Sequence, residues 1–304
     1  MERYAGPAIE FDAKSFDPIK VMPVTHKLMG HPLLQLDRLV ALGRRLAAKG
    51  SVRWHGDDAR PDSSFHFAPE THKAQWSAEM TLERISEAKA WMSLLNVQQD
   101  PEYRGLIDEI LEDVRPRVEA KDPGMSYRAG WIFISSPNAV TPFHIDHEHN
   151  FILQVQGKKL LHVWEPLDPE VLSERALELF HARHSRELVQ FRPEFDARAH
   201  KFQLEPGLGG YMPTNAPHWV LNGPEVSITV SATYYSELTR RRKLLYCSNH
   251  ALRSLGLHPQ PVGSSPLRET VKLAGYKTAR AGNHALKRLR GMTFDDIYAA
   301  YAPA

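Results

Sequence analysis

Residues 141–159 read TPFHIDHEHNFILQVQGKK, and the stretch NAPH at residues 215–218 supplies one more histidine. His144 and Asp146 are two positions apart, so in a β-strand their side chains project from the same face. With His218 they supply two imidazoles and one carboxylate, the donor set of the 2-His-1-carboxylate iron sites. Three such ligands leave open positions on the metal, which suits ferrous iron and dioxygen chemistry.

The histidines next to this motif raise the question of further ligands. His147, Glu148 and His149 extend the segment to HIDHEH. Four or more strong protein ligands would close the metal site, so we do not expect these residues to bind the metal. We expect them to line the mouth of the site, where they would contact substrate, or to lie in a solvated loop. Other histidines are expected to be surface or structural residues: His162, His181, His184 and His200.

Short β-rich segments separated by glycine and proline turns run from about Tyr127 to Tyr235. Two strands are predicted around the Gln156-Gly157 turn. A strand, a turn and a second strand are predicted over residues 202–213, followed by a loop that presents His218. A last strand follows the turn at residues 222–224. This pattern predicts an all-β barrel or jelly roll. Five aromatic residues on or beside these strands are expected in its core: Trp131, Trp164, Trp219, Tyr234 and Tyr235.

The central stretch resembles a known family. Its run T-P-x-H-x-D-x-x-x-N-F-x-x-Q-x-x-G-x-K, at residues 141–159, resembles the JmjC-type cupin hydroxylases, and among them the asparaginyl hydroxylases most of all. The pattern P-G-x-x-x-Y-x-P…H…N-G…I-T-V, at residues 206–230, is similar to the other half of the same barrel. Several offsets agree at once over about 110 residues. The resemblance implies a mainly β protein, a double-stranded β-helix of the cupin/JmjC jelly-roll type with N-terminal and C-terminal helices.

Carried over residue by residue, the resemblance implies that His144, Asp146 and His218 bind Fe(II), with 2-oxoglutarate and O₂ as cosubstrates. The implied activity is hydroxylation of a substrate C–H bond, most of all in a protein or peptide side chain. A small-molecule hydroxylase of the same class is an alternative. Two alternatives come from other classes. One is a non-catalytic cupin-like binding protein or regulator that binds nucleic acid through a basic C-terminal region. The other is a cupin enzyme that uses another divalent metal for isomerisation or hydrolysis.

The resemblance also implies a cosubstrate site. Lys159 would hold the far carboxylate of 2-oxoglutarate, because a lysine ammonium serves as a point charge for an anion. The Thr141 hydroxyl would help, with Asn150 nearby. Ser231 falls where the asparaginyl hydroxylases have a cosubstrate-contacting asparagine, so this contact is shortened or replaced. Lys158, on the opposite face of the same strand, is the alternative lysine.

Composition bounds the protein class. A chain of 304 residues with 42% hydrophobic residues can bury one sizeable core plus helical additions. The single cysteine, Cys247, excludes an intrachain disulfide and fits a reducing compartment. No stretch approaches the ~20 continuous apolar residues of a membrane span, and residues 1–4 lack the apolar core of a signal peptide. We expect a cytoplasmic protein without membrane contact.

The formal net charge of +2 is unevenly distributed. From Thr239 to Arg290 there are 12 Lys and Arg residues and one acid, Glu269, so this segment carries +11 and the remainder −9. Such a segment can recruit nucleic acid, acidic protein or anionic lipid. We favour a solvated helical face, or one that packs against the acidic remainder or a second subunit. The resemblance adds a homodimer through the C-terminal helices.

Three regions are predicted: a helical or mixed region at 1–121, the cupin barrel at 122–238 with an insertion at about 166–199, and a basic helical region at 239–304. We expect the insertion to help shape substrate access and to be helical around residues 170–184. Three helices are predicted before the barrel, over residues 36–50, over residues 81–96 and after the Asp100-Pro101 start signal. A linker is predicted at 256–266, which contains three prolines.

Overall fold

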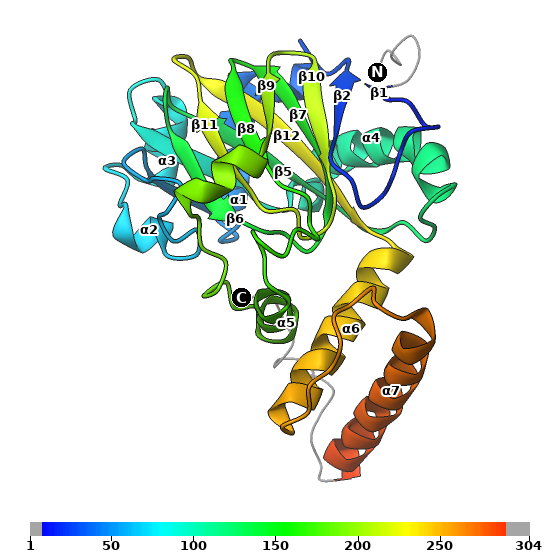
Figure 1. Ribbon diagram of the computed structural model, residues 1–304. Helices are drawn as coiled ribbons and strands as arrows, with labels where there is room; N and C mark the ends of the chain where they lie inside the picture. The colour runs from blue at the N-terminus through cyan, green and yellow to red at the C-terminus, as the bar shows by residue number, and fades with distance from the viewer. Residues whose placement is uncertain (1–7, 290–304) are drawn as a thin grey trace. The chain divides into compact units, whose positions relative to one another are not determined.

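In the computed structural model, which describes residues 8–289, two antiparallel sheets pack against each other (Figure 1). The larger sheet has the strand order β1-β2-β10-β7-β12-β5-β4-β3, and the smaller has the order β6-β11-β8-β9. In chain order the strands are β1 (Ile9–Glu10), β2 (Met22–His26), β3 (Val52–Gly56), β4 (Ala90–Leu94), β5 (Ser126–Ser135), β6 (Val140–His144), β7 (His149–Gln156), β8 (Lys159–Val163), β9 (His200–Leu204), β10 (Leu208–Met212), β11 (His218–Asn222) and β12 (Ser227–Tyr235).

The chain crosses between the two sheets at nearly every connection from β5 to β12. Strands β5, β7, β10 and β12 lie side by side in the larger sheet, whereas β6, β8, β9 and β11 make up the smaller one. Eight antiparallel strands shared between two sheets in this way form a jelly roll. The predicted double-stranded β-helix is therefore confirmed.

Strand β12 explains why the barrel interior is polar. Its side chains alternate between the two faces of the sheet. One face is apolar and belongs to the large hydrophobic core: Ile228, Val230, Ala232 and Tyr234. The other face points into the barrel and carries hydroxyl groups that are all buried: Ser227, Thr229, Ser231 and Thr233. The main hydrophobic core thus lies outside the barrel, and its interior is left for polar chemistry.

Helices of the N-terminal region cover the apolar face of the larger sheet. Helix α4 starts at Pro101, and the Asp100 side chain caps it by accepting a hydrogen bond from the Glu102 N–H at 3.2 Å. The predicted start signal is confirmed, and seven side chains of α4 are buried. The helices are α1 (Leu36–Ala47), α2 (Ala68–Thr71), α3 (Ala78–Glu83), α4 (Pro101–Glu119), α5 (Glu174–Arg183), α6 (Glu237–Ser254) and α7 (Pro266–Leu289).

The helix predicted over residues 81–96 is wrong. Helix α3 ends at Glu83, and Ala90–Leu94 form strand β4, which pairs with β3 on one side and β5 on the other. Every residue of β4 is buried. A strand that is apolar on both faces gives a continuous apolar run, which periodicity does not distinguish from a buried helix.

The five aromatic residues that we expected in the core differ in their burial. Trp164 and Tyr234 are fully buried, as expected. Trp131, Trp219 and Tyr235 are only partly buried. Trp219 stacks on His162 with ring centroids 4.0 Å apart, outside the barrel interior. His162 in turn pairs with Asp196, and its role is structural, as expected.

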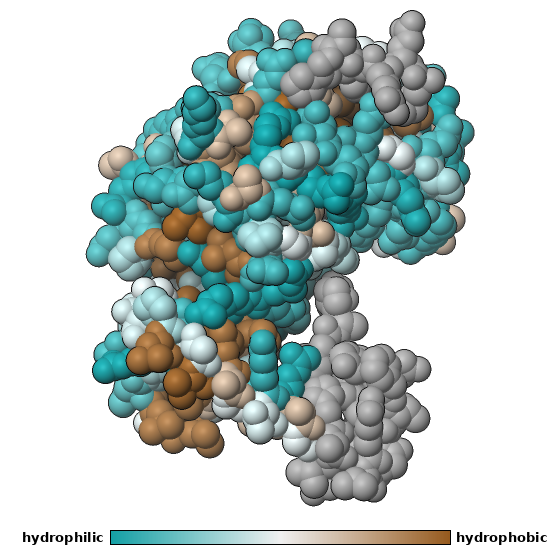
Figure 2. Space-filling model, turned by 90° about the vertical axis from the view of Figure 1, so that its right-hand side faces the viewer, coloured by the Kyte–Doolittle hydropathy of each residue, from teal (hydrophilic) through white to brown (hydrophobic). Residues whose placement is uncertain are grey.

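The described residues form two units, 8–172 with 189–239, and 173–188 with 240–289. The second unit contains α5, α6 and α7. The predicted helix of the insertion is confirmed as α5, and the predicted linker connects α6 to α7. Apolar side chains gather low in the view of Figure 2, at the height of α6 and α7 in Figure 1. Five large apolar side chains of this unit are exposed: Leu188, Leu255, Leu257, Leu267 and Val271.

Among residues 8–289, no helix is both long and apolar enough to cross a membrane. The division into regions 1–121, 122–238 and 239–304 stays a prediction. Residues 290–304 of the basic segment lie outside the described part of the chain.

Candidate metal centre

Three predicted ligands meet at one end of the barrel. His144 is the last residue of β6, Asp146 lies in the turn that follows, and His218 is the first residue of β11. The Asp146 Oδ2 atom lies 3.8 Å from His144 Nε2 and 3.7 Å from His218 Nε2. Two positional expectations were wrong, because Asp146 is beyond the strand and His218 is on a strand rather than in a loop. The three donor atoms nevertheless lie within 4.8 Å of one another.

The hydrogen bonds of the two histidines define their tautomers. His144 Nδ1 lies 2.8 Å from the Pro142 carbonyl, and His218 Nδ1 lies 3.0 Å from the Ala216 carbonyl. A carbonyl only accepts, so each Nδ1 carries the proton and each Nε2 presents a lone pair. The Asp146 carboxylate also accepts only, and its distances to the Nε2 atoms exceed a hydrogen bond. Three acceptor groups converge on one point, an arrangement that a divalent cation satisfies.

A β-bulge directs Thr141 into the barrel together with His144. In the pairing of β6 with β11, His144 lies opposite His218 and Thr141 lies opposite Val220. The step is three residues on β6 and two on β11, so β6 contains one extra residue. Without it, strand alternation would turn Thr141 away from the histidine face. With it, Thr141 and both ligand histidines share the interior face.

Lys159 and Lys158 have opposite environments. Lys159 lies on the same face of β8 as Leu161 and Val163, which pack inside the barrel, and it is 5% exposed. Burial lowers the pKa of its ammonium to about 7, and no carboxylate among residues 8–289 offsets this effect. Lys158 points outward with a side chain 53% exposed, and its Nζ pairs with Glu205 at 2.8 Å. Of the two candidate lysines, Lys159 is the one inside the barrel.

Asn150 and Ser231 contact each other across neighbouring strands. The Ser231 hydroxyl donates a hydrogen bond to Asn150 Oδ1 at 2.6 Å, and both side chains are buried. Within the described chain, three buried polar atoms on the interior faces of β5 and β11 form no hydrogen bond: Trp131 Nε1, Ser135 Oγ and Asn222 Oδ1. Asn222 lies directly opposite Lys159 in the pairing of β11 with β8. Buried polar atoms without partners indicate a place for a polar ligand.

Phe65 covers the predicted metal ligand His144, a role that we did not expect from the sequence. Its ring stacks on the His144 ring with centroids 3.8 Å apart and planes within 5°. On the Phe65 ring lies the Arg53 guanidinium, 4.4 Å from the centroid, which also donates to the Phe65 carbonyl. The segment is held further by the Phe143 N–H, which donates to the Pro61 carbonyl at 3.0 Å. No motif in the sequence around Phe65 signals this stacking.

His149 lies neither at the mouth nor in a solvated loop, so both expectations for it were wrong. It is fully buried. Its Nδ1 accepts a hydrogen bond from the Thr214 N–H at 3.2 Å and lies 2.8 Å from the Tyr211 hydroxyl. Its Nε2 lies 3.2 Å from Ser236 Oγ and 3.3 Å from Asp122 Oδ2. His149 therefore joins the segment after Asp146 to the segment that precedes His218.

The position of His149 follows from the strand that it begins. His149 is the first residue of β7 and shares a face with Phe151 and Leu153, which belong to the large core outside the barrel. Its neighbour Glu148 is also buried and accepts a hydrogen bond from the Tyr235 hydroxyl at 3.0 Å. Burial and the nearby Glu148 carboxylate raise the pKa of Tyr235. Contact of His147 and Glu148 with substrate stays a prediction.

Replacing His149 by phenylalanine is expected to lower the free energy of unfolding by about 3 kcal/mol, because it leaves the buried Asp122 carboxylate without the hydrogen bond from the His149 Nε2–H. Burial alone raises the pKa of Asp122, but hydrogen bonds from His149 and Ser236 outweigh it and lower the pKa overall. Urea unfolding measures the change. The exposed His258 provides the control, since its replacement by phenylalanine is expected to change stability by less than about 0.5 kcal/mol. Equal stabilities of the two variants would contradict this role.

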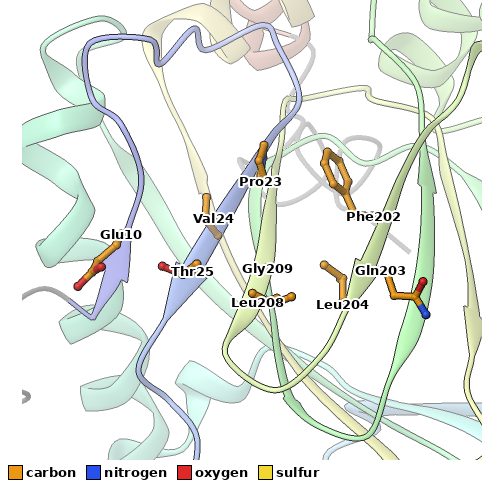
Figure 3. A pocket seen from close by; sticks show the side chains of 9 residues that line it. All are labelled: Glu10, Pro23, Val24, Thr25, Phe202, Gln203, Leu204, Leu208 and Gly209. Atoms are coloured by element: carbon orange, nitrogen blue, oxygen red, sulfur yellow. The ribbon is translucent and has the colours of Figure 1, made fainter.

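A pocket of about 240 Å³ lies away from the triad, between the larger sheet and β9, the edge strand of the smaller sheet (Figure 3). Its walls are side chains of β2, β9 and β10, and they are mostly apolar. Glu10 is its only charged lining residue, and none of the predicted site residues contributes to it.

Several solved structures are similar to the chain. A structure of Escherichia coli YcfD is 17% identical, covers 88% of this chain and 66% of its own, and has a TM-score of 0.49. YcfD, described as a ribosomal oxygenase, in complex with cobalt and 2-oxoglutarate is 19% identical, with coverages of 85% and 63% and a TM-score of 0.44. Its complex with cobalt and succinic acid is also 19% identical, with coverages of 84% and 62% and a TM-score of 0.42.

The chain thus spans 62% to 66% of the length of these structures. No curated protein sequence matches the chain at a significant level. A family model, described as the Cupin-like domain, matches residues 41–239, which is more than half of the chain and includes the whole barrel. The chain belongs to the cupin-like domain family.

Proposed function

We propose that the protein is an Fe(II)- and 2-oxoglutarate-dependent dioxygenase that hydroxylates a C–H bond in a protein or peptide side chain. The observation that carries the proposal is Lys159, a buried ammonium in the same interior as the triad, with no carboxylate among residues 8–289 beside it. An isolated buried charge is costly unless a partner compensates it. A dicarboxylate that chelates the metal at one end and meets Lys159 at the other supplies that partner.

The register of the smaller sheet gives the spacing between the two ends. His218 begins β11, and Asn222, opposite Lys159, ends it four residues later. At about 3.3 Å per residue this is roughly 13 Å between backbone levels. A five-carbon diacid, a metal ion and a lysine side chain together fill such a span. The partnerless donors of Trp131 and Ser135 offer further hydrogen bonds to a polar ligand in the same interior.

When bound, ferrous iron with 2-oxoglutarate and O₂ supplies oxidative decarboxylation to succinate and CO₂, together with transfer of one oxygen atom to substrate. The chain's own residues hold and position these groups. His144, Asp146 and His218 bind the metal, and the carbonyl contacts of both Nδ1 atoms keep the ligand lone pairs aimed at it. Phe65 excludes water from one side of His144. Lys159 orients the cosubstrate.

The substrate, the partners and the compartment are parts of the same proposal. The resemblance of residues 141–159 to the asparaginyl hydroxylases supports a protein or peptide substrate. The exposed apolar side chains on α7, Leu267 and Val271, lie one turn apart and support a homodimer through the C-terminal helices. A single cysteine supports a reducing, cytoplasmic environment.

The proposal is tested by following 2-oxoglutarate and succinate by NMR in the presence of Fe(II) and air. Without added substrate we expect only slow succinate formation, and it should stop when iron, oxygen or 2-oxoglutarate is left out. A matched sample with Lys159→Met is expected to form succinate only at much higher 2-oxoglutarate. Turnover of any compound that continues without O₂ and 2-oxoglutarate would contradict the proposal and favour a different metal chemistry.

The affinity for 2-oxoglutarate is expected to fall as the pH rises above about 7. With a pKa of about 7, Lys159 in the ligand-free protein is charged below that pH and neutral above it. The dianion binds the charged form, so binding above pH 7 takes up a proton and weakens by up to about tenfold per pH unit. The measurement is an anaerobic titration with 2-oxoglutarate at several pH values between roughly 7 and 9.

In the same range the ligand-free protein is expected to become more stable with rising pH, because the unfolded chain keeps the proton up to its ordinary pKa of 10.5. The Lys159→Met variant is the control. Its affinity for 2-oxoglutarate and its stability should both lose the change with pH that Lys159 causes, while changes caused by other titrating groups remain. An affinity for 2-oxoglutarate in the wild-type protein that does not change with pH would contradict the position of the charge.

A further inference from the structure

The unit formed by residues 173–188 and 240–289 is strongly basic. It contains 14 lysine and arginine residues and 4 glutamates, a formal net charge of +10. We expected these charges to form a solvated helical face, or one that packs against the acidic remainder or a second subunit, but part of them gather at one place between α5 and α6. Two arginines of α5 contact both ring nitrogens of one histidine of α6.

The contacts at this place contain too many donors. Arg175 NH1 lies 3.2 Å from His250 Nδ1, and Arg183 Nε lies 3.1 Å from His250 Nε2. A guanidinium only donates, and a neutral imidazole accepts at one nitrogen while the other carries a proton. One of the two guanidinium groups therefore faces a ring N–H group, so that two hydrogen-bond donors meet without an acceptor between them. A protonated ring would be worse, since it would place a third cation between the two arginines.

Of these two arginines, only Arg175 pairs with a carboxylate among the described residues, and it shares that carboxylate with Arg253. Glu178 is fully buried and is engaged by Arg253 through two contacts of 2.9 Å, with Arg175 at 3.3 Å. The Glu174 carboxylate accepts from the Val262 N–H at 3.3 Å. Over residues 8–289, no carboxylate pairs with Arg183, whose side chain is exposed. Burial and then the charges of Arg175 and Arg183 lower the pKa of His250.

An oxyanion resolves the mismatch, because it accepts from both guanidinium groups and from the ring N–H at once. Arginine forks match the geometry of phosphate oxygens. Further cations extend from this place along the same unit, with Lys243 on α6 and Lys277 and Arg280 on α7. Helix α7 has 24 residues and is about 36 Å long. A surface of this length suits an extended polyanion better than a single phosphate group.

We propose that Arg175, Arg183 and His250 form a phosphate-binding site through which this unit binds the backbone of a nucleic acid. The site is independent of the barrel and of the function proposed for it. Such binding is sequence-tolerant and depends steeply on salt, because each phosphate contact releases condensed counterions.

The test uses the full chain and a fluorescein-labelled single-stranded RNA of about 20 nucleotides, followed by fluorescence anisotropy from roughly 50 to 200 mM salt. The Arg175→Gln/Arg183→Gln variant is expected to bind about tenfold more weakly at low salt. The slope of log affinity against log salt should fall by about 1.4, or 0.7 for each lost phosphate contact on a single strand. Circular dichroism checks that the helices are intact.

The matched control is Lys49→Gln/Lys121→Gln, which removes the same charge from exposed positions of the other unit. It is expected to weaken binding by less than about threefold. Equal losses in the two variants would show diffuse attraction and overturn the assigned site. Absence of RNA binding, or binding of phosphatidylserine vesicles but not RNA through Arg175 and Arg183, would overturn the nucleic-acid assignment.

Discussion

Replacing Asp146 by alanine is expected to lower 2-oxoglutarate turnover by more than about a hundredfold. The variant keeps both histidine Nε2 atoms but removes the only negative charge of the triad, which lies 3.7 and 3.8 Å from them. Loss of a hydrogen-bond partner outside the ligand set already costs ten- to a hundredfold in metal affinity or activity, so loss of a ligand costs more. The rate of succinate formation at saturating iron and cosubstrate measures the effect.

The control for this variant is Glu225→Ala, which removes an exposed carboxylate from the turn before β12. It is expected to leave turnover unchanged, because the side chain is outside the barrel. Wild-type turnover in the Asp146→Ala variant would mean that the triad does not hold the metal.

Replacing Lys159 by methionine is expected to raise the 2-oxoglutarate concentration needed for half-maximal turnover about a hundredfold. A hydrogen bond to a charged group contributes about 1.5–3 kcal/mol, which corresponds to a factor between about 10 and 150. The matched variant Lys158→Met is expected to change the requirement less than about twofold, because that side chain is exposed and pairs with Glu205. The reverse order of effects would show that Lys158 binds the cosubstrate.

The same Lys159→Met variant is expected to be more stable than the wild type in the absence of 2-oxoglutarate. Methionine is close in length to lysine and removes a buried, uncompensated ammonium. Replacing buried charge by well-packed apolar groups can stabilise by roughly 1–4 kcal/mol. Urea unfolding at pH 7 without cosubstrate measures this difference. A loss of stability would indicate that the ammonium has a partner within the protein.

Local sequence was sufficient to predict the type of barrel and to single out the three residues that the structure brings together as candidate ligands. His144 and Asp146 belong to one short motif, and the alternation in β12 signals a polar interior. The position of His149 could also have been predicted, because it shares strand parity with the apolar Phe151 and not with the polar Asn150. The expectation for His149 failed because we assigned it to the mouth of the site or to a loop, whereas it is the first residue of strand β7.

Other features depend on contacts that sequence periodicity does not encode. Thr141 and His144 share a face only because β6 contains an extra residue, and no glycine marks that bulge. Phe65 lies 79 positions before His144 in the sequence, and the two rings meet only in the folded chain. Their stacking depends on where the loop after β3 folds. Strand β4 was predicted as a helix because burial on both faces removes the alternation that identifies a strand.

The most direct measurement is an anaerobic optical titration of the metal-free protein with Fe(II) and then 2-oxoglutarate. We expect a visible metal-to-ligand charge-transfer band in the wild type, because the cosubstrate chelates an iron held by His144, Asp146 and His218. The band should be lost in Asp146→Ala and require far more 2-oxoglutarate in Lys159→Met. Absence of the band in a wild-type protein that binds iron would contradict the central claim that this barrel binds iron and 2-oxoglutarate together.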